Sequence, residues 1–273
     1  MDEKTMTQDA RRIYLIQELQ KEMPEFAKYP IPKKKSEQEE FLRGLFNVRP
    51  VHPVSEEFTS VQDAYLKERA AEKGITDAAS LPVVPSDARL VLWKGDITTL
   101  RCDAVVNAAN SSMTGCWRWC HYCIDNAIQT YSGYQTRRDC AEYMENKRKK
   151  YGDGYMQPTS LPMLTSAYNL PSKYIVHVVG PIVTPFLTAK HKEQLAACYR
   201  NCLNLAEKHG CTNIAFCSIS TGVFMFPPEK AAVTAVATVK KWLDEHPDSC
   251  MQKVIFNVFS DSQLAIYQEL LGR

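Results

Sequence analysis

The sequence has no long hydrophobic run and little net charge. None of its segments contains the roughly 18 uninterrupted apolar residues of a membrane-spanning helix, and its polar first residues are not followed by the apolar core of a secretory signal. Its 33 Lys and Arg residues nearly balance 31 Asp and Glu, so the net charge of +2 indicates no overall preference for nucleic acid. Internal repeats and low-complexity stretches are also absent. We therefore expect a cytoplasmic protein that binds neither membranes nor nucleic acid.

The ten cysteines are spread over 273 residues instead of being crowded into a short secreted domain. Most of them lie in apolar runs, as Cys217 does, and are expected to be buried free thiols. Hydrophobic residues make up 45% of the chain and aromatic residues 10%, which is sufficient for a sizeable core. The basic cluster at 147–150 is typical of the solvated end of a helix.

Residues 1–82 differ in pattern from the rest of the chain. Apolar residues recur with helical spacing around 13–19 and 41–46, and both groups stop at prolines. A third helix is expected at 60–73, and a stretch with two prolines at 81–85 then looks like a join. We predict a helical N-terminal extension at 1–82, followed by one larger domain at 83–273.

In the larger domain, short β-rich apolar runs alternate with helical stretches. The predicted strands are 90–93, 104–107, 174–179, 214–218 and 254–259. The predicted helices are 125–147, 192–209, 228–244 and 262–271. This alternation predicts a three-layer α/β domain with a mostly parallel or mixed sheet.

The most informative segment follows the second of these strands. Two asparagines, Asn107 and Asn110, lie at the strand end, where open α/β sheets bind ligands. Cys116, His121 and Cys123 come directly after them, and two thiols with an imidazole are ligands that zinc prefers. Three ligands leave one tetrahedral position open for chemistry, but Cys120 could complete a closed structural site. The remaining alternative is a group of unligated cysteines beside an ordinary histidine.

Two further strand ends carry polar or glycine-containing turns. The loop at 218–227 combines hydroxyl residues with Gly222 between a strand and a helix, which suits a phosphate group, although a plain turn explains it equally well. It matches neither a P-loop nor a G-x-G-x-x-G pattern. Asp96 follows another strand, where it either binds a ligand or caps a short helix.

Three more residues have two interpretations each. Asp125 lies two positions after Cys123 and either activates a water molecule or caps the next helix. His177 lies within an apolar strand and is either a ligand or, as we expect, a core histidine with its hydrogen bonds satisfied. Phe259 ends the last strand and either stacks on a flat ring or packs in the core.

Taken together, Gly95-Asp96-Ile97, the Asn107–Asn110 run, 177–181, 220–224 and 258–261 resemble the macrodomain family in order and spacing. More narrowly, the segment from Gly115 to Asn126 resembles zinc-dependent protein-ADP-ribose hydrolases of that family. The resemblance covers nearly the whole chain and implies a three-layer α/β/α macrodomain with a mixed central sheet, preceded by a helical extension.

The resemblance also implies particular ligand contacts. Asp96 and the Ile97 backbone would bind adenine, with Phe259 against the ring, and Asn110 would hold the distal ribose with support from Asn107. Cys116, His121 and Cys123 would bind zinc beside the bond that is cut, which makes Cys120 a bystander. The diphosphate would be wrapped by Ser220, Thr221, Gly222, Val223, Phe224 and Met225, with Ile124 on the opposite wall.

Three positions depart from the family pattern. Gln129 stands where a histidine is usual, so general-base catalysis from this position is not expected and the burden shifts to the metal. Met225 occupies a position where glycine is common, which matters if the backbone there needs a positive φ. Bulky residues at 117–119 replace smaller ones and are expected to reshape the mouth of the site.

The expected function is therefore a zinc-dependent hydrolase that removes mono-ADP-ribose from modified protein side chains, with an ester link to Asp or Glu. Asn110 and Asp125 would be its catalytic residues and zinc its cofactor. The alternative is a module that binds ADP-ribose without cleaving it and uses zinc as a structural clip. A nucleobase deaminase is disfavoured because the residue two positions after His121 is cysteine instead of glutamate.

Overall fold

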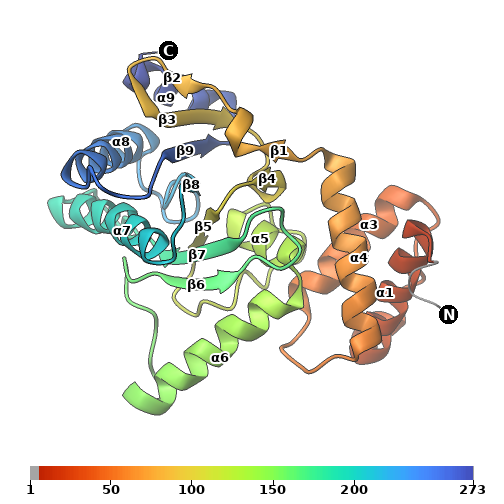
Figure 1. Ribbon diagram of the computed structural model, residues 1–273. Coiled ribbons are helices and arrows are strands. Elements are labelled where there is room, and N and C mark those ends of the chain that lie inside the picture. Colours follow the sequence, from red (N-terminus) through yellow and green to blue (C-terminus); the bar gives the residue numbers. More distant parts are fainter. Residues whose placement is uncertain (1–5, 273) are drawn as a thin grey trace.

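The computed structural model describes residues 6–272 and contains a mixed seven-stranded sheet with helices on both faces (Figure 1). The strand order is β2-β3-β9-β8-β5-β7-β6, in which β2 and β6 run antiparallel to their neighbours and the other pairings are parallel. The strands of this sheet are β2 (Val83–Val84), β3 (Asp87–Lys94), β5 (Ala104–Ala109), β6 (Met163–Ser166), β7 (Tyr174–Val179), β8 (Asn213–Phe216) and β9 (Lys253–Val258).

Helices α7, α8 and α9 pack one after another on one face of the sheet, and α5 and α6 lie on the other (Figure 1). Their bounds are α5 (Ile124–Ser132), α6 (Tyr134–Tyr151), α7 (Ala189–Lys208), α8 (Pro228–Glu245) and α9 (Asp261–Leu271). The chain steps along the sheet in one direction from β5 to β7 and in the other from β7 through β8 to β9. Because crossovers between parallel strands are right-handed, the helices of these two sets of connections lie on opposite faces. The predicted three-layer α/β/α fold with a mixed sheet is confirmed.

The N-terminal part of the described chain forms a helical group beside α5 (Figure 1). It consists of α1 (Gln8–Glu22), α2 (Pro24–Ala27), α3 (Lys35–Val48) and α4 (Glu56–Lys73). These helices bury a hydrophobic cluster of their own, which includes Leu15, Leu45 and Phe58, while Tyr131 of α5 packs against both this cluster and the main core. The helical nature of the extension is as predicted, and the boundary at residue 82 remains a prediction.

A line of buried polar side chains joins the extension to the larger domain. Gln62 of α4 donates to Gln135 over 3.0 Å and accepts from the Tyr134 backbone N–H over 3.1 Å. Asp63 accepts from Gln135 over 2.9 Å and from Asn169 over 2.8 Å. Buried polar groups need such partners, so each side of this junction satisfies the other.

The prediction of one helix over 125–147 is wrong. The chain breaks at Gly133, whose φ of 97° lies in the left-handed region, and α6 starts at the next residue. A Cβ atom at Gly133 would lie 2.7 Å from the Asn169 amide and 2.8 Å from the Gln62 amide. The polar junction therefore approaches the backbone too closely for any other residue.

Several shorter elements were not predicted from the sequence. The two-stranded sheet of β1 (Thr76–Asp77) and β4 (Leu100–Arg101), the 3₁₀ turn Ala78–Ser80, α2, and the strands β2 and β6 all belong to this group. The 3₁₀ turn Ile97–Thr99, by contrast, is the short helix that Asp96 caps in one of its two predicted interpretations. Helix α4 also starts earlier than predicted, because the Ser55 hydroxyl caps it by accepting from the Phe58 N–H over 3.0 Å.

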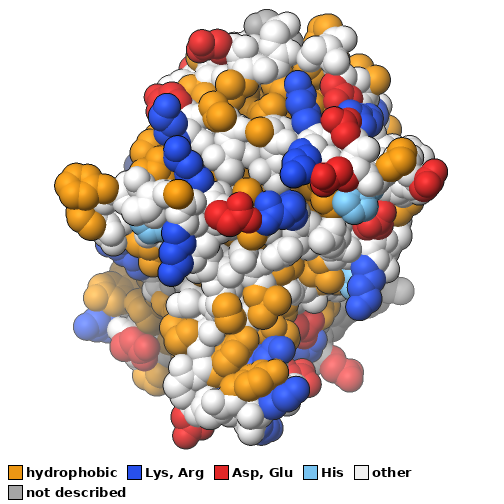
Figure 2. Space-filling view, turned by 90° about the vertical axis from the view of Figure 1, so that its left-hand side faces the viewer, with side chains coloured by type: hydrophobic (Ala, Val, Ile, Leu, Met, Phe, Trp, Pro, Cys, Tyr) orange, Lys and Arg blue, Asp and Glu red, His pale blue; other side chains and the backbone are white. Residues whose placement is uncertain are grey.

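The described part of the chain contains no helix long and apolar enough to cross a membrane. Figure 2 shows the face on the side of α7 and α8, where Lys and Arg side chains are interspersed with Asp and Glu. Charge of neither sign dominates this face. Of the basic cluster at 147–150, Arg148, Lys149 and Lys150 lie in the last turn of α6, where positive side chains are favoured by the helix dipole.

Candidate active site

The predicted site residues gather at one edge of the sheet. Strands β3, β5, β8 and β9 are parallel, so their carboxyl ends meet at the same edge. Asp96 follows β3, Asn107 and Asn110 lie in or just after β5, Ser220 follows β8 and Phe259 follows β9. The fold therefore brings together residues that are up to 163 positions apart, from Asp96 to Phe259, as the sequence pattern predicted.

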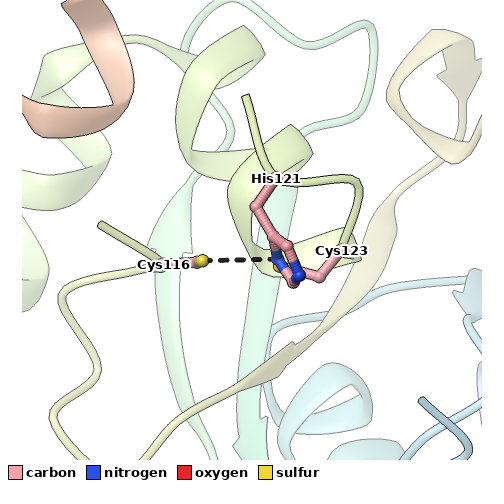
Figure 3. A group of neighbouring side chains, drawn as sticks. All are labelled: Cys116, His121 and Cys123. Atoms are coloured by element: carbon pink, nitrogen blue, oxygen red, sulfur yellow. Dashed lines mark hydrogen bonds between the residues drawn. The ribbon is translucent and has the colours of Figure 1, made fainter. Parts of the chain in front are cut away.

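Three potential metal ligands lie close together after β5. The ligand atoms of Cys116, His121 and Cys123 are all within 4.8 Å of one another, and Cys116 Sγ is 3.5 Å from His121 Nδ1 (Figure 3). Two thiols and an imidazole at this spacing suit zinc, whose bonds to sulfur and nitrogen are about 2.0–2.3 Å long. Burial, followed by the neighbouring Cys116, raises the pKa of the Cys123 thiol, so metal binding here must displace protons.

Cys120 does not join this group. Its sulfur donates to the Glu40 carbonyl oxygen over 3.3 Å, and its backbone N–H donates to Asn47 Oδ1 over 2.9 Å. Both partners belong to α3. A metal held by these three side chains alone would keep a fourth tetrahedral position open.

Asn107 connects the buried part of the site. This fully buried side chain donates through Nδ2 to Asp125 Oδ1 over 2.8 Å and lies 3.1 Å from His177 Nδ1. We assign both amide hydrogens of Asn107 as donors, which leaves His177 protonated on Nε2, where it faces Thr165 Oγ1 at 3.0 Å. His177 is thus a core histidine with its hydrogen bonds satisfied, as predicted.

Asp125 lies in the first turn of α5, where it is 4% exposed. Burial raises the pKa of its carboxyl to about 6, although the hydrogen bond from Asn107 and the charge of Arg137 oppose the change. The interpretation of Asp125 as the cap of α5 is wrong, because the N-cap is Cys123, whose sulfur accepts from the Asn126 N–H over 3.4 Å. Ile124 is the first residue of the helix, so its backbone N–H points out of the α5 N-terminus.

Asn110 fixes the turn between β5 and the ligands. Its Nδ2 donates to the Gly115 carbonyl over 2.9 Å and approaches Asp125 Oδ2 at 3.4 Å, while its Oδ1 accepts from the Ser112 N–H over 2.9 Å. The Asn110 amide therefore lies between Asp125 and Gly115, directly before Cys116. This position suits a side chain that orients a substrate next to the metal ligands.

The loop after β8 exposes backbone donors. In the described structure the N–H groups of Gly222, Val223 and Phe224 have no hydrogen-bond partner, whereas Met225 N donates to Gly222 O over 2.9 Å. Ser220 and Met225 both have positive φ, 66° and 55°. Successive backbone N–H groups without partners in a turn are typical of anion sites. The Met225 position therefore does use the conformation that glycine adopts most easily.

The opposite end of the site carries a carboxylate and an aromatic ring. Asp96 caps the turn Ile97–Thr99 by accepting from the Thr98 N–H over 2.9 Å, and its other oxygen lies 3.0 Å from Lys73 Nζ. Burial raises the pKa of the Asp96 carboxyl, but the charge of Lys73 and the hydrogen bonds from Thr98 and Lys73 lower it by more. The pKa of Asp96 is therefore below its ordinary value. Ile97 is buried, whereas Phe259 is 77% exposed, which excludes the core interpretation of that ring.

Gln129 and Gly115 pack against each other behind the ligands. A Cβ atom on Gly115, whose φ is 91°, would lie 2.7 Å from Gln129 Cγ. Gln129 Oε1 is buried without a partner, and its Nε2 lies 3.9 Å from Cys140 Sγ. The side chain thus supports the turn before Cys116.

Two functional candidates were missed in the sequence. Arg137 is buried beneath Trp117, with its guanidinium 4.3 Å from the ring centre, and donates to the Phe46 and Arg49 carbonyls over 3.1 and 3.2 Å. Arg43 of α3 donates to the His121 carbonyl over 3.0 Å. Neither arginine belongs to a local motif, so no signal in the sequence separates them from solvated charges.

Comparison with known proteins gives consistent results. The Macro domain family matches residues 106–235. A "Protein-ADP-ribose hydrolase" of Treponema medium is 47% identical and covers 98% of this chain and 100% of its own length. One of Staphylococcus aureus strain Mu50, with the same description, is 43% identical and covers 97% of this chain and 96% of its own.

Solved structures agree with these relatives. A Trypanosoma brucei macrodomain in complex with ADP-ribose has a TM-score of 0.63 and 28% identity, covering 83% of this chain and 94% of its own. A mutant of an Oceanobacillus iheyensis macrodomain with ADPR has a TM-score of 0.59 and 36% identity, covering 67% of this chain and 91% of its own. The strand order, the polar residues at the sheet edge and the relatives that match nearly its full length all agree. The chain belongs to the macrodomain family.

Proposed function

We propose that the protein is a zinc-dependent hydrolase that removes mono-ADP-ribose from modified protein side chains linked through Asp or Glu. The observation that carries this proposal is the group Cys116, His121 and Cys123, which lies directly after Asn110 at the ligand-binding edge of a macrodomain sheet. The description of the two bacterial relatives as protein-ADP-ribose hydrolases supports the hydrolytic part. The ester linkage and the metal are inferences of ours.

The chain's own residues suit successive parts of ADP-ribose. The exposed Phe259 ring offers a surface for adenine, next to Asp96 and the Ile97 backbone. The free N–H groups of Gly222, Val223 and Phe224 suit the diphosphate, with Ser220, Thr221 and Met225 shaping the loop and Ile124 at the α5 N-terminus. Asn110 then reaches the distal ribose.

At the bond that is cut, Cys116, His121 and Cys123 would hold zinc with one position open. Bound zinc supplies Lewis-acid polarisation of an oxygen and a lower pKa for a coordinated water. Asn110 orients the ribose hydroxyls. Asp125 lies beside it, with one carboxylate oxygen accepting from Asn107 and the other from Asn110. Gln129 has no titratable group near neutral pH, so it packs against the loop instead of moving a proton.

The test is release of free ADP-ribose from a protein mono-ADP-ribosylated on Asp or Glu. Zinc-loaded and chelator-treated samples would be compared, with folding followed by circular dichroism. Cys116→Ser should lose both zinc and release, whereas Cys120→Ser is the matched control in the same loop and should keep both. We expect release that requires zinc while the fold persists.

Three results would overturn parts of this proposal. Tight binding of ADP-ribose with no release from any sample would instead indicate a binding module with a structural metal. Full release by Cys116→Ser at low zinc content would exclude the proposed role of the metal. Release from a serine-linked carrier but not from an Asp- or Glu-linked one would correct the linkage alone.

A further inference from the structure

The loop at 116–123 carries the three proposed metal ligands but contains no helix or strand of its own. Helix α3 of the N-terminal extension lies against it. Arg43 Nη2 donates both to the His121 carbonyl, over 3.0 Å, and to Asn126 Oδ1, over 3.1 Å. The amide nitrogen of Asn126 in turn donates to the Cys116 carbonyl over 3.3 Å and to the Arg118 carbonyl over 3.0 Å. One arginine and one asparagine therefore hold the backbone of two of the three ligands.

The same face of α3 makes a second contact one turn further along. Asn47 is fully buried, accepts from the Cys120 N–H over 2.9 Å and donates to Thr130 Oγ1 over 2.6 Å. Residues four apart on a helix share a face, so Arg43 and Asn47 both point at the loop. Their contacts fall on His121 and Cys120, in the middle of the loop.

Between these two side chains, Gly44 leaves room for an aromatic ring. A Cβ atom at Gly44 would lie 2.1 Å from the Trp119 indole, so α3 is shaped to receive this side chain. Trp119 is also stacked on Phe26, with ring centres 5.3 Å apart, and lies 5.8 Å from Phe41. Trp119 therefore anchors the loop in the extension by packing, in addition to the two polar contacts.

We propose that helix α3 is part of the metal site and that Arg43 is a positioning residue for His121. A loop that is free to move loses conformational entropy when it closes on an ion, and contacts that fix it beforehand remove that cost. Groups that orient metal ligands from outside typically contribute about 10- to 100-fold in metal affinity. This inference rests on the proposed function, because it assumes that the loop binds zinc.

Arg43 is well placed to be tested by a conservative change. A lysine keeps the positive charge, but its Nζ lies one bond nearer to Cα than the Nη2 atom with which Arg43 reaches His121 O and Asn126 Oδ1 together. Arg11 provides the matched control. It is also an arginine of the extension, but it pairs with Glu68 of α4 over 2.5 Å and, within residues 6–272, forms no hydrogen bond or ion pair with the loop.

The experiment measures zinc affinity by competition with a chromophoric chelator for the wild type, Arg43→Lys, Arg43→Ala and Arg11→Ala. Hydrogen–deuterium exchange of residues 116–123 is followed in the metal-free proteins, whose folding is checked by circular dichroism. We expect the zinc dissociation constant to rise at least 10-fold in both Arg43 variants, with faster exchange in the loop, while Arg11→Ala stays within 2-fold of the wild type.

Wild-type zinc affinity and unchanged loop exchange in Arg43→Lys and Arg43→Ala would overturn the inference. An equal loss in Arg11→Ala would also overturn it, because the effect would then reflect general weakening of the extension. If the wild type binds no zinc, the proposed function fails, and the exchange measurement on metal-free protein alone decides whether Arg43 braces the loop. Should Arg43→Ala fail to fold, Arg43→Lys carries the test.

Discussion

Acid should weaken this protein through His177, a residue outside the proposed chemistry. Burial lowers the pKa of His177 to about 3, against about 6.5 in an unfolded chain. The folded state therefore binds fewer protons than the unfolded state between these values. The stability contributed by neutral His177 is present above pH 6.5 and is lost progressively as the pH falls towards 3.

The size of the effect follows from the two pKa values. Between pH 7.5 and pH 5, proton binding by His177 in the unfolded state should lower the free energy of unfolding by about 2 kcal/mol. Asp125 acts in the opposite direction, because its raised pKa lets the folded protein take up a proton in the same range. Cys140, 3.9 Å from His177 Nε2, stays protonated because burial raises the pKa of its thiol.

A comparison with His177→Gln isolates the histidine. Glutamine retains an oxygen that can accept from Asn107, and the Asp125 contribution is common to both proteins. Urea unfolding at pH 7.5, 6 and 5 gives the difference in the free energy of unfolding between them. We expect this difference to shrink by about 2 kcal/mol over the range, and a difference that stays constant would refute the assignment of a neutral buried histidine.

Two further substitutions test the ligand-binding edge. Phe259→Ala should weaken ADP-ribose binding in calorimetry by about 1–2 kcal/mol without changing the melting temperature, because the ring is exposed. Tyr29→Ala, in the extension, is the control. Equal binding by both variants would contradict adenine stacking. Met225→Gly should raise the free energy of unfolding by about 1 kcal/mol, because Met225 has a positive φ. Val223 does not have a positive φ, so Val223→Gly should lower the free energy of unfolding in the same urea titration. A loss of stability in Met225→Gly would show that the methionine side chain contributes more than the backbone strain costs.

Much of the fold was predictable because its signals are local. The five central strands are short apolar runs, and each was expected close to its observed bounds. The grouping of Asp96, Asn110, Ser220 and Phe259 followed from one rule, that parallel strands end at the same edge. The candidate ligands in the 116–123 loop were also readable, since two cysteines and a histidine within eight residues stand out in the sequence.

The features that escaped prediction depend on distant partners. Gly133 looked like one glycine within a helical pattern, and only the approach of Asn169 and Gln62 explains the break there. Strands β2 and β6 are edge strands whose pairing is decided by neighbours far along the chain. Arg43 lies 78 residues from its acceptor at His121, so nothing in its own segment marks it.

The polar junction between α4 and the larger domain has a consequence for how the molecule comes apart. Removing the extension would take away Gln62 and Asp63, the partners of Gln135 and Asn169, and would open these two buried side chains to water. Tyr131 would at the same time lose one of the two clusters that it touches. Extension and sheet therefore form one cooperative unit, which should melt in a single transition, and a minimal version cut at the predicted boundary would start from a damaged surface.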